Sequence, residues 1–174
     1  LRSKRVDAII LAGSKVVEMK PRDNAYLIDA GKEFPLMLVN GYLEGPGIYS
    51  TLCDDRAAAF EAATMLIESG KRNILYLYTS YSYSGLNKLQ GYKDALNAAG
   101  IFVREEYIRQ CPKNITAARD LCARLFEDGL EFDGCLTSDD SLAVGAVKFA
   151  HQAGISVPEQ LSVIGYNNSI LAQC

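Results

Sequence analysis

Runs of apolar, β-branched residues alternate with helix-patterned segments along the 174-residue chain. The runs that predict strands are 6–12, 35–40, 73–79, 102–107, 134–138 and 161–166, with a weaker extended stretch at 48–53. Their almost unbroken hydrophobicity is typical of strands buried on both faces, as in a parallel sheet. Because parallel strands joined by short helical crossovers form right-handed βαβ units, the pattern predicts an α/β fold with doubly wound parallel sheets.

Each helix-patterned segment is followed by a glycine. Apolar residues at helical spacing predict helices over 55–69, 86–99, 115–128 and 140–153. The glycines that follow them are Gly70, Gly100, Gly129 and Gly154. Glycine is favoured there because the residue after a helix often adopts a left-handed conformation. A shorter fifth helix is expected around 22–32, ending near Gly31.

The stretch GYLEGPGIYS, residues 41–50, differs in composition from the rest, with three glycines and one proline in ten positions. It is typical of a surface loop or of the approach to a crossover between two lobes. Asp54 follows it and is expected to cap the helix over 55–69, near a hinge. We therefore predict that residues 1–53 form part of an incomplete N-terminal lobe and residues 54–174 a C-terminal lobe.

Charge and cysteine content exclude several classes of function for this segment. The net charge is −3 and no window is rich in Lys or Arg, so a nucleic-acid-binding surface is not expected within it. We find no apolar run of 18 residues and no signal peptide, which predicts no membrane contact. The five cysteines are odd in number and lack CxxC spacing. They are expected to be reduced thiols of a cytoplasmic protein, with no metal and no cofactor.

Polar residues follow the predicted strands. In open α/β sheets ligands bind beyond the carboxyl ends of the strands, so these residues are candidates for a binding site. They are Gly13–Ser14, Asn40, the Tyr81–Ser84 loop, Asp139–Asp140 and Asn167–Asn168. Asp139 and Asp140 could be a catalytic pair, but adjacent residues at a helix start usually point apart, which favours one of them as an N-cap or a helix-dipole partner. The chain has no G-x-G-x-x-G after its first strand, no P-loop, no G-x-S-x-G and no H-E-x-x-H, so an enzyme is not expected.

Three segments resemble the lac repressor/galactose repressor family of bacterial transcription regulators. CDDRAAAFEAATMLIESGKRNILYL (53–77) is similar to the family's crossover into its C-terminal lobe, and KLQGYKDALNAAGI (88–101) to its R-L-x-G-[FYW]-x-x-A-[LM] helix. TSDDSLAVGAVKFAHQAGISVPEQLSVIGYNN (137–168) resembles the block N-D-x-x-A-x-G…G-x-x-V-P-x-[DE]-[VIL]-S-[VIL]-[VIL]-G-[FY]-[DN]-[DN]. The order and spacing match over essentially the whole chain.

The resemblance implies a two-lobed, periplasmic-binding-protein-like sensor that is not an enzyme. It would bind a small carbohydrate-like effector between the lobes and thereby modulate the grip of a homodimeric repressor on operator DNA. An N-terminal helix-turn-helix, absent from this chain, would contact the DNA. A transport-type periplasmic sugar-binding protein shares the fold and is the alternative, against which unpaired cysteines argue.

The resemblance also assigns site residues. Asn167 takes the position of a ligand-contacting Asp, Lys88 that of a ligand-contacting Arg, and Asp139 that of an Asn or similar polar contact. Asn40 falls where the N-terminal lobe of some members contributes a polar group. The Arg→Lys and Asp→Asn differences replace a planar fork by a point charge and an anion by an amide, so an effector different from the common hexoses is expected.

The alternatives for these positions are structural. Lys88 could be a solvated helix residue, and Asn167 could be a turn residue. Tyr83 could stack on a sugar ring, to which Ser84 would add a hydrogen bond, or it could stay half-solvated in its loop. Asp54 would act on the ligand only indirectly, as a helix cap near the hinge.

Overall fold

The computed structural model describes residues 6–13 and 15–173 of the chain. They form two compact units, each treated separately below. The first unit runs to Asp55 and takes in Tyr81–Asn87, and the second comprises Arg56–Ser80 and the chain from Lys88 onward. The predicted lobe boundary between residues 53 and 54 remains a prediction for the complete protein. The candidate Ser14 lies outside the described residues.

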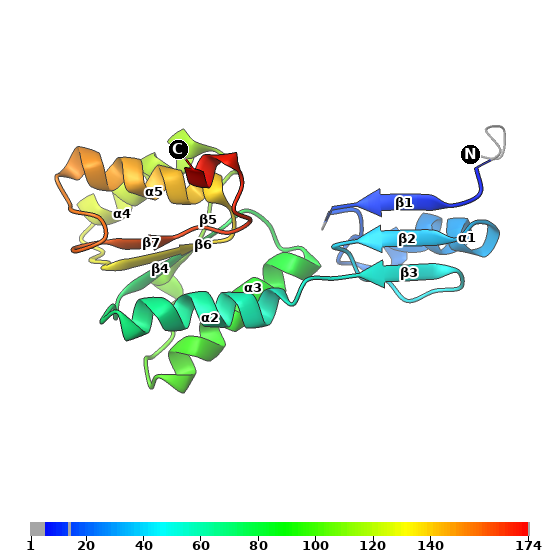
Figure 1. Cartoon of the computed structure of the whole chain (residues 1–174), viewed down its shortest axis with the longest axis horizontal. Helices are drawn as coiled ribbons and strands as arrows, with labels where there is room; N and C mark the ends of the chain where they lie inside the picture. Colours follow the sequence, from blue (N-terminus) through cyan, green and yellow to red (C-terminus); the bar gives the residue numbers. More distant parts are fainter. Residues whose placement is uncertain (1–5, 14, 174) are drawn as a thin grey trace. The chain divides into compact units, whose positions relative to one another are not determined.

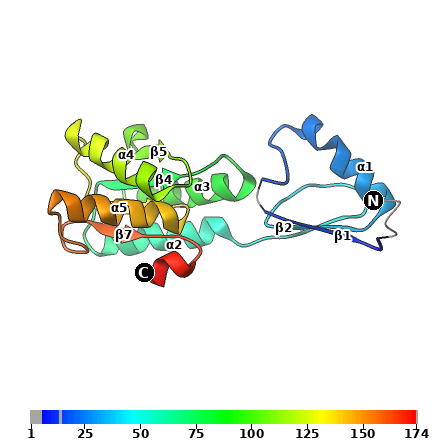
Figure 2. The same cartoon turned by 90° about the horizontal axis from the view of Figure 1, so that it is seen from above.

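The first unit is a three-stranded parallel sheet with a helix on one face. Its strands are β1 (Ile9–Ala12), β2 (Leu36–Val39) and β3 (Ile48–Thr51), in the order β1-β2-β3. A short 3-10 helix, Pro21–Asn24, leads into α1 (Ala25–Glu33), which lies along one face of the strands (Figure 2). Leu27 of α1 packs with Leu36 and Leu38 of β2 to form the buried core of this unit.

Gly31 has a different role from the one predicted, because α1 continues past it to Glu33. The residue is buried within the helix, and a Cβ atom built on it would lie 2.5 Å from the carbonyl oxygen of Pro46. Glycine is therefore required here for the close approach of α1 to the chain before β3, and it does not terminate the helix.

The second unit is a four-stranded parallel sheet covered on both faces. Its strands are β4 (Ile74–Tyr78), β5 (Ile108–Gln110), β6 (Gly134–Thr137) and β7 (Ser162–Ile164), in the order β5-β4-β6-β7. The helices are α2 (Asp55–Glu68), α3 (Tyr83–Ala98), α4 (Ile115–Glu127) and α5 (Asp140–Ala153). The first residue of α2 and the start of α3, as far as Asn87, belong to the first unit. Two further 3-10 turns span Glu105–Tyr107 and Ile170–Gln173.

Strand β4 has apolar or aromatic residues at every position because both of its faces are buried. Leu75 and Leu77 pack into the cluster under α4 and α5, whereas Ile74, Tyr76 and Tyr78 pack into the cluster under α2 and α3. Since successive side chains of a strand point to opposite faces, an apolar residue is needed at every position. Figure 1 shows the helices on the two sides of this sheet. The predicted α/β fold with doubly wound parallel sheets is confirmed.

The predicted ends of the other four helices are confirmed. The four glycines that follow α2, α3, α4 and α5 all have positive φ: 94° at Gly70, 69° at Gly100, 87° at Gly129 and 69° at Gly154. At Gly154 the backbone N–H also bonds to the carbonyl oxygens of Ala150 and His151. Glycine adopts this left-handed conformation without a steric penalty, which is why these helix ends can be recognised in the sequence.

The predicted strand over 102–107 is wrong. Phe102 is 83% exposed, and Glu105–Tyr107 is a 3-10 turn. The edge strand is instead β5, which pairs with β4 through Ile108 opposite Tyr76. Tyr107 is buried and its hydroxyl donates to the carbonyl oxygen of Glu131 at 2.7 Å. The shift arises because pairing with β4, and not local hydrophobicity, decides where an edge strand begins.

Helix α3 begins at Tyr83, three positions before the predicted start at residue 86. Ser82 closes its first turn: its hydroxyl accepts from the N–H of Gly85 at 3.2 Å, and its carbonyl from that of Leu86 at 2.8 Å. A serine at this place is a common helix start, so the signal is present in the sequence. Tyr83 and Ser84 therefore lie on a helix and not in the predicted loop.

The described cysteines have free thiols, namely Cys53, Cys111, Cys122 and Cys135, whereas Cys174 lies outside the described residues. Burial raises the pKa of Cys122 to about 12, so this thiol behaves as a small apolar side chain. Over the described part of the chain, we find no helix that is both long and apolar enough to span a membrane.

Candidate functional site

Asp139 lies at the carboxyl end of β6, where it begins α5. Its Oδ1 accepts from the backbone N–H of Ser141 at 3.0 Å and from the Ser141 hydroxyl at 2.6 Å. This makes Asp139 the N-cap of the helix. The prediction that one of the two adjacent carboxylates caps the helix is thus confirmed, because the cap satisfies N–H groups that have no partner inside the helix.

The second oxygen of Asp139 joins two other strand ends of the same sheet. Its Oδ2 lies 2.7 Å from the ammonium nitrogen of Lys113, which follows β5. The Nδ2 of Asn167, beyond β7, lies 3.4 Å from the same oxygen. Residues that follow three parallel strands therefore meet around one carboxylate. This convergence is what the carboxyl edge of a parallel sheet provides.

Opposing influences act on the pKa of Asp139. Burial of the carboxyl group raises it, but hydrogen bonds from Lys113 and Ser141, together with the positive charge of Lys113, outweigh the burial. The net effect lowers the pKa below its ordinary value. Asp139 therefore remains an anion at neutral pH and keeps its ion pair with Lys113.

Lys113 is a site residue that the sequence analysis missed. The signal that could have found it is its place shortly after a strand, the same rule that selected Asn40 and Asn167. Because the strand was predicted to end at residue 107 and not at Gln110, Lys113 did not count as a strand-end residue. The wrong position predicted for the edge strand is thus the reason why Lys113 was left out of the predicted site.

Lys88 is buried, which contradicts the alternative of a solvated helix residue. Its ammonium nitrogen lies 3.6 Å from the centre of the Tyr166 ring and 3.4 Å from the carbonyl oxygen of Ser138. Over an aromatic face a cation is stabilised by the negative π surface of the ring. The structure therefore places Lys88 beside the residues that precede Asp139 and Asn167.

Asn167 is exposed and has a φ of 94°. Asn tolerates positive φ better than most residues, which accounts in part for its place after β7. Close by, the carboxylate of Asp140 accepts from the backbone N–H of Ser169 at 2.6 Å and so fixes the turn that follows Asn167. The geometry of Asn167 combines a turn conformation with a strand-end position beside Asp139.

Asn40 takes the corresponding place in the first unit, directly after β2, with a φ of 60°. Its backbone N–H donates to the carbonyl oxygen of Thr51 at 2.9 Å. Its side-chain Oδ1 is buried, and no donor among the described residues reaches it. A buried acceptor without a hydrogen bond costs free energy. We therefore expect the Oδ1 of Asn40 to accept a hydrogen bond from a group outside the described residues.

Tyr83 stacks on Tyr42 within the first unit, with ring centroids 5.5 Å apart. The Tyr42 hydroxyl in turn donates to Glu44, and this hydrogen bond to a carboxylate raises the pKa of Tyr42. Ser84 is buried, which leaves its hydroxyl little exposed surface. Asp54 is exposed and directly precedes α2, and its predicted cap stays a prediction.

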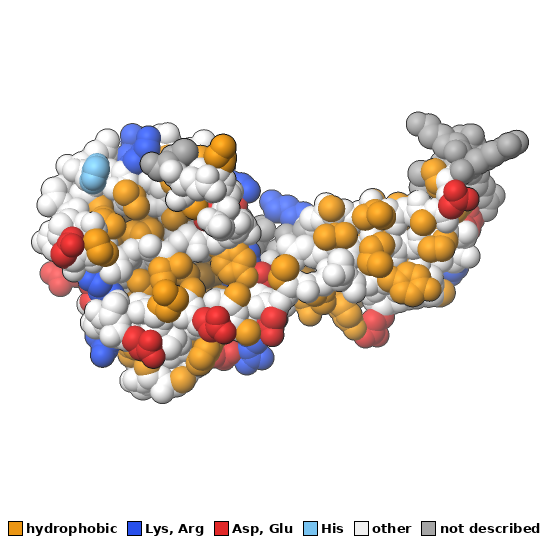
Figure 3. All heavy atoms as spheres, in the orientation of Figure 1, with side chains coloured by type: hydrophobic (Ala, Val, Ile, Leu, Met, Phe, Trp, Pro, Cys, Tyr) orange, Lys and Arg blue, Asp and Glu red, His pale blue; other side chains and the backbone are white. Residues whose placement is uncertain are grey.

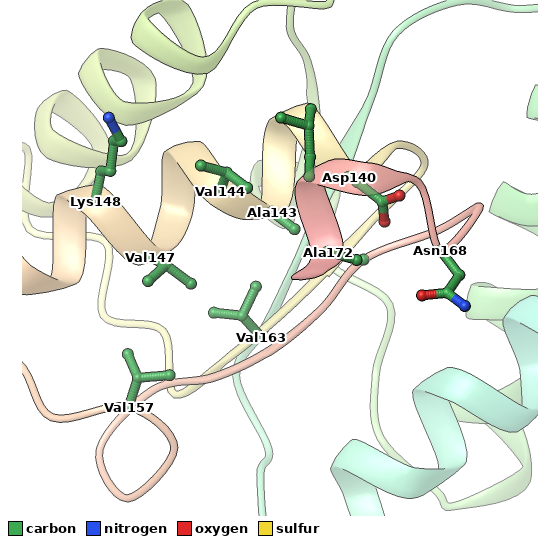
Figure 4. A pocket seen from close by; sticks show the side chains of 11 residues that line it. Asp140, Ala143, Val144, Val147, Lys148, Val157, Val163, Asn168 and Ala172 are labelled. Atoms are coloured by element: carbon green, nitrogen blue, oxygen red, sulfur yellow. The ribbon is translucent and has the colours of Figure 1, made fainter. Parts of the chain in front are cut away.

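A separate pocket of about 520 Å³ lies between α5 and β7 and is mostly apolar (Figure 4). Val147, Val157 and Val163 line it, and Asp140 and Asn168 lie at one end. Asp139 and its partners at the sheet edge are not part of its lining. Among the described residues, we find no group of three or more His, Cys, Asp or Glu side chains able to hold a metal ion.

Comparison with known proteins identifies relatives over the whole chain. Residues 1–172 match the family model described as periplasmic binding proteins and sugar binding domain of the LacI family. An HTH-type transcriptional regulator of Lachnoclostridium phytofermentans is 48% identical over 174 residues, which are 100% of this chain and 52% of the relative. The HTH-type transcriptional regulator AscG of Escherichia coli is 35% identical over 84% of this chain and 44% of its own length.

Solved structures agree with these matches. A sugar-binding transcriptional regulator of the LacI family from Escherichia coli, solved in complex with phosphate, has a TM-score of 0.83 at 32% identity and covers 99% of this chain and 61% of its own. The Escherichia coli repressor AscG has a TM-score of 0.80 at 31% identity, covering 98% of this chain and 61% of its own. The chain spans about half the length of the curated relatives it matches. It belongs to the family of periplasmic binding proteins and LacI-family sugar-binding domains.

Proposed function

We propose that this chain is the effector-sensing part of a repressor-type transcription regulator and that its effector is a small carbohydrate-like molecule. The supporting observation is the meeting of Lys113, Asp139 and Asn167 at one sheet edge, with Lys88 buried close by. Together they offer an amide and ammonium groups over a short distance, and the Asp139 carboxylate holds Lys113 and Asn167 beside each other. Such a mixture of donors and acceptors suits the hydroxyl groups of a sugar.

Two further observations support a polar effector. The buried Oδ1 of Asn40 needs a hydrogen-bond donor, which a sugar hydroxyl can supply. In addition, relatives of the chain are HTH-type transcriptional regulators, and one neighbour of the same fold was solved as a CelR–cellobiose complex. By extension, the complete protein would act as a cytoplasmic homodimer that binds operator DNA through a helix-turn-helix, and it would catalyse no reaction.

The experiment uses the full-length protein and a panel of neutral and acidic mono- and disaccharides. A sugar that binds the native state should raise its apparent thermal stability. The same sugar should change the affinity of the protein for a fluorescent DNA fragment taken from the region upstream of its own gene. A sugar that is consumed, or a panel in which no sugar stabilises the protein, would contradict the proposal.

The transport-type alternative makes a different prediction. A transport protein would bind the sugar but would show no affinity for the DNA fragment, with or without sugar. The regulator proposal is favoured because the curated relatives are transcriptional regulators.

A further inference from the structure

Asp139 has little capacity left for an effector. Its Oδ1 accepts from the N–H and the hydroxyl of Ser141, and its Oδ2 from Lys113 and Asn167. A carboxylate offers about four lone-pair directions, so these contacts fill it. Its side chain is also only 10% exposed. The position that the family resemblance assigns to ligand contact is thus already occupied by donors of the chain itself.

Lys113 is in the opposite situation, because its side chain is 67% exposed. Among the described residues its ammonium group contacts Asp139, and an ammonium group has three N–H donors. Two donors therefore remain for an acceptor from outside. The ion pair with Asp139 holds the end of this long side chain close to Asn167, whose amide also carries a carbonyl oxygen able to accept.

The charges at this sheet edge favour an acceptor-rich partner. The carboxylates of Asp139 and Asp140 are buried, and Asn167 is neutral. Lys88 is also cationic but is buried against Tyr166. Among the described residues of this sheet edge, the charge that is most accessible to a ligand is therefore the positive one of Lys113.

We propose that Lys113 contacts the effector and selects a sugar that carries a carboxylate over its neutral counterpart. Asp139 positions the ammonium group, and Asn167 accepts from a hydroxyl of the same sugar. The inference rests on the proposed function, since it names the chemical class of the effector at the same site. A carboxylate is favoured because hydrogen bonds between an ammonium and an anion are stronger than those to neutral oxygens.

The test compares matched pairs of probes that differ by one carboxylate: glucose and glucuronate, galactose and galacturonate, cellobiose and cellobionate. Binding to the full-length protein is measured by thermal shift and then by calorimetry. In the wild type, the acid of at least one pair should bind about ten times or more tightly than the neutral sugar. In Lys113→Met this preference should disappear, because the variant keeps an unbranched side chain but lacks the charge. Lys113→Arg should retain part of it.

Lys148→Met is the matched control, because it also removes the positive charge of an exposed lysine. Lys148 lies on α5, farther from the N-terminus of that helix than Asp139. It should leave the preference for the acid unchanged. A ratio of affinities is informative here, since a mere loss of folded protein would lower the binding of both probes together.

Two results would overturn the inference, and they differ in what else they affect. If a neutral sugar binds the wild type and Lys113→Met equally well, with no preference for its acid, Lys113 does not select the effector, while the proposed function stands. If no carbohydrate of either kind binds, the proposed function fails and this inference fails with it.

Discussion

The two parallel sheets of this protein differ in how many of their faces are covered by helices in the part of the chain described. The second sheet has helices on both faces, and the residues after three of its strands are linked through Asp139. In the first sheet α1 covers one face, while the other carries a row of exposed apolar side chains.

That row consists of Ile10, Met37 and Tyr49, which lie directly opposite one another on β1, β2 and β3. They are 72%, 38% and 59% exposed. Figure 3 shows hydrophobic side chains gathered over these strands. In the part of the chain described, similar apolar strands are thus buried on two faces in the second unit and on one face in the first. An apolar strand sequence therefore does not by itself decide how many faces are covered.

The largest expected effect concerns packing in the second sheet. Leu77→Ala removes a fully buried side chain from the cluster under α4 and α5, so it should lower the free energy of unfolding of this unit by about 2–5 kcal/mol. Met37→Ala, on the exposed face of the first sheet, should change the stability of its own unit by about 0.5 kcal/mol or less. Hydrogen exchange of the strand amides measures each unit separately. Similar losses in both variants would remove the contrast between the sheets.

The next effect concerns the strand end after β7. Asn167→Gly removes the amide that lies beside Asp139 but tolerates the φ of 94°, which an alanine would not do without strain. If the amide contacts the effector, binding of the stabilising sugar should weaken by about 1–3 kcal/mol, or roughly ten- to a hundredfold.

Asn168→Gly is its control, as the neighbouring amide also has a positive φ, of 49°, and is exposed. Calorimetry of both variants gives the comparison. Unchanged affinity in Asn167→Gly would place Asn167 outside the site.

A smaller effect separates the two strand-end asparagines. Asn40→Ala should destabilise the first unit by about 1 kcal/mol, because its backbone at φ 60° is unfavourable for a residue with a Cβ atom and no compensating side-chain hydrogen bond. Asn40→Gly should be neutral or stabilising in the absence of effector, since it also removes a buried oxygen without a donor among the described residues. Chemical denaturation of both variants tests this. A loss of stability in the glycine variant equal to that in the alanine variant would mean that the side chain matters more than the backbone.

The smallest effect is a pH dependence at Asp139. Because its pKa is lowered in the folded state, the ionised carboxylate stabilises the fold above the pKa of the unfolded chain, and this contribution is lost as the pH falls through the folded-state pKa. Lys113→Met should move the folded-state pKa upward and so shift that loss to higher pH. Carbon-13 NMR of the carboxyl group follows the titration. Lys93→Met, at a lysine paired with Glu105, serves as a control and should leave Asp139 unchanged.

Local sequence determined much of this protein. The apolar strands of the second sheet required two covered faces, and the glycines after α2, α3, α4 and α5 required positive φ, so the α/β fold and these helix ends could be predicted. The strand-end rule likewise selected Asn40, Asp139 and Asn167 from the order of residues alone. These features depend on the periodicity of a segment or on the conformation of one residue, and both are properties of the local amino-acid sequence.

Other features were decided only by tertiary structure. The edge strand β5 begins at Ile108 because that residue lies opposite Tyr76, and this register brings Lys113 to the sheet edge. Gly31 lies inside α1 because another part of the chain passes close to it. The ion pair of Lys113 with Asp139 forms because the ends of β5 and β6 are brought together on the two sides of β4. Contacts between residues far apart in sequence leave no local pattern, which is why the partner of Asp139 could not be predicted.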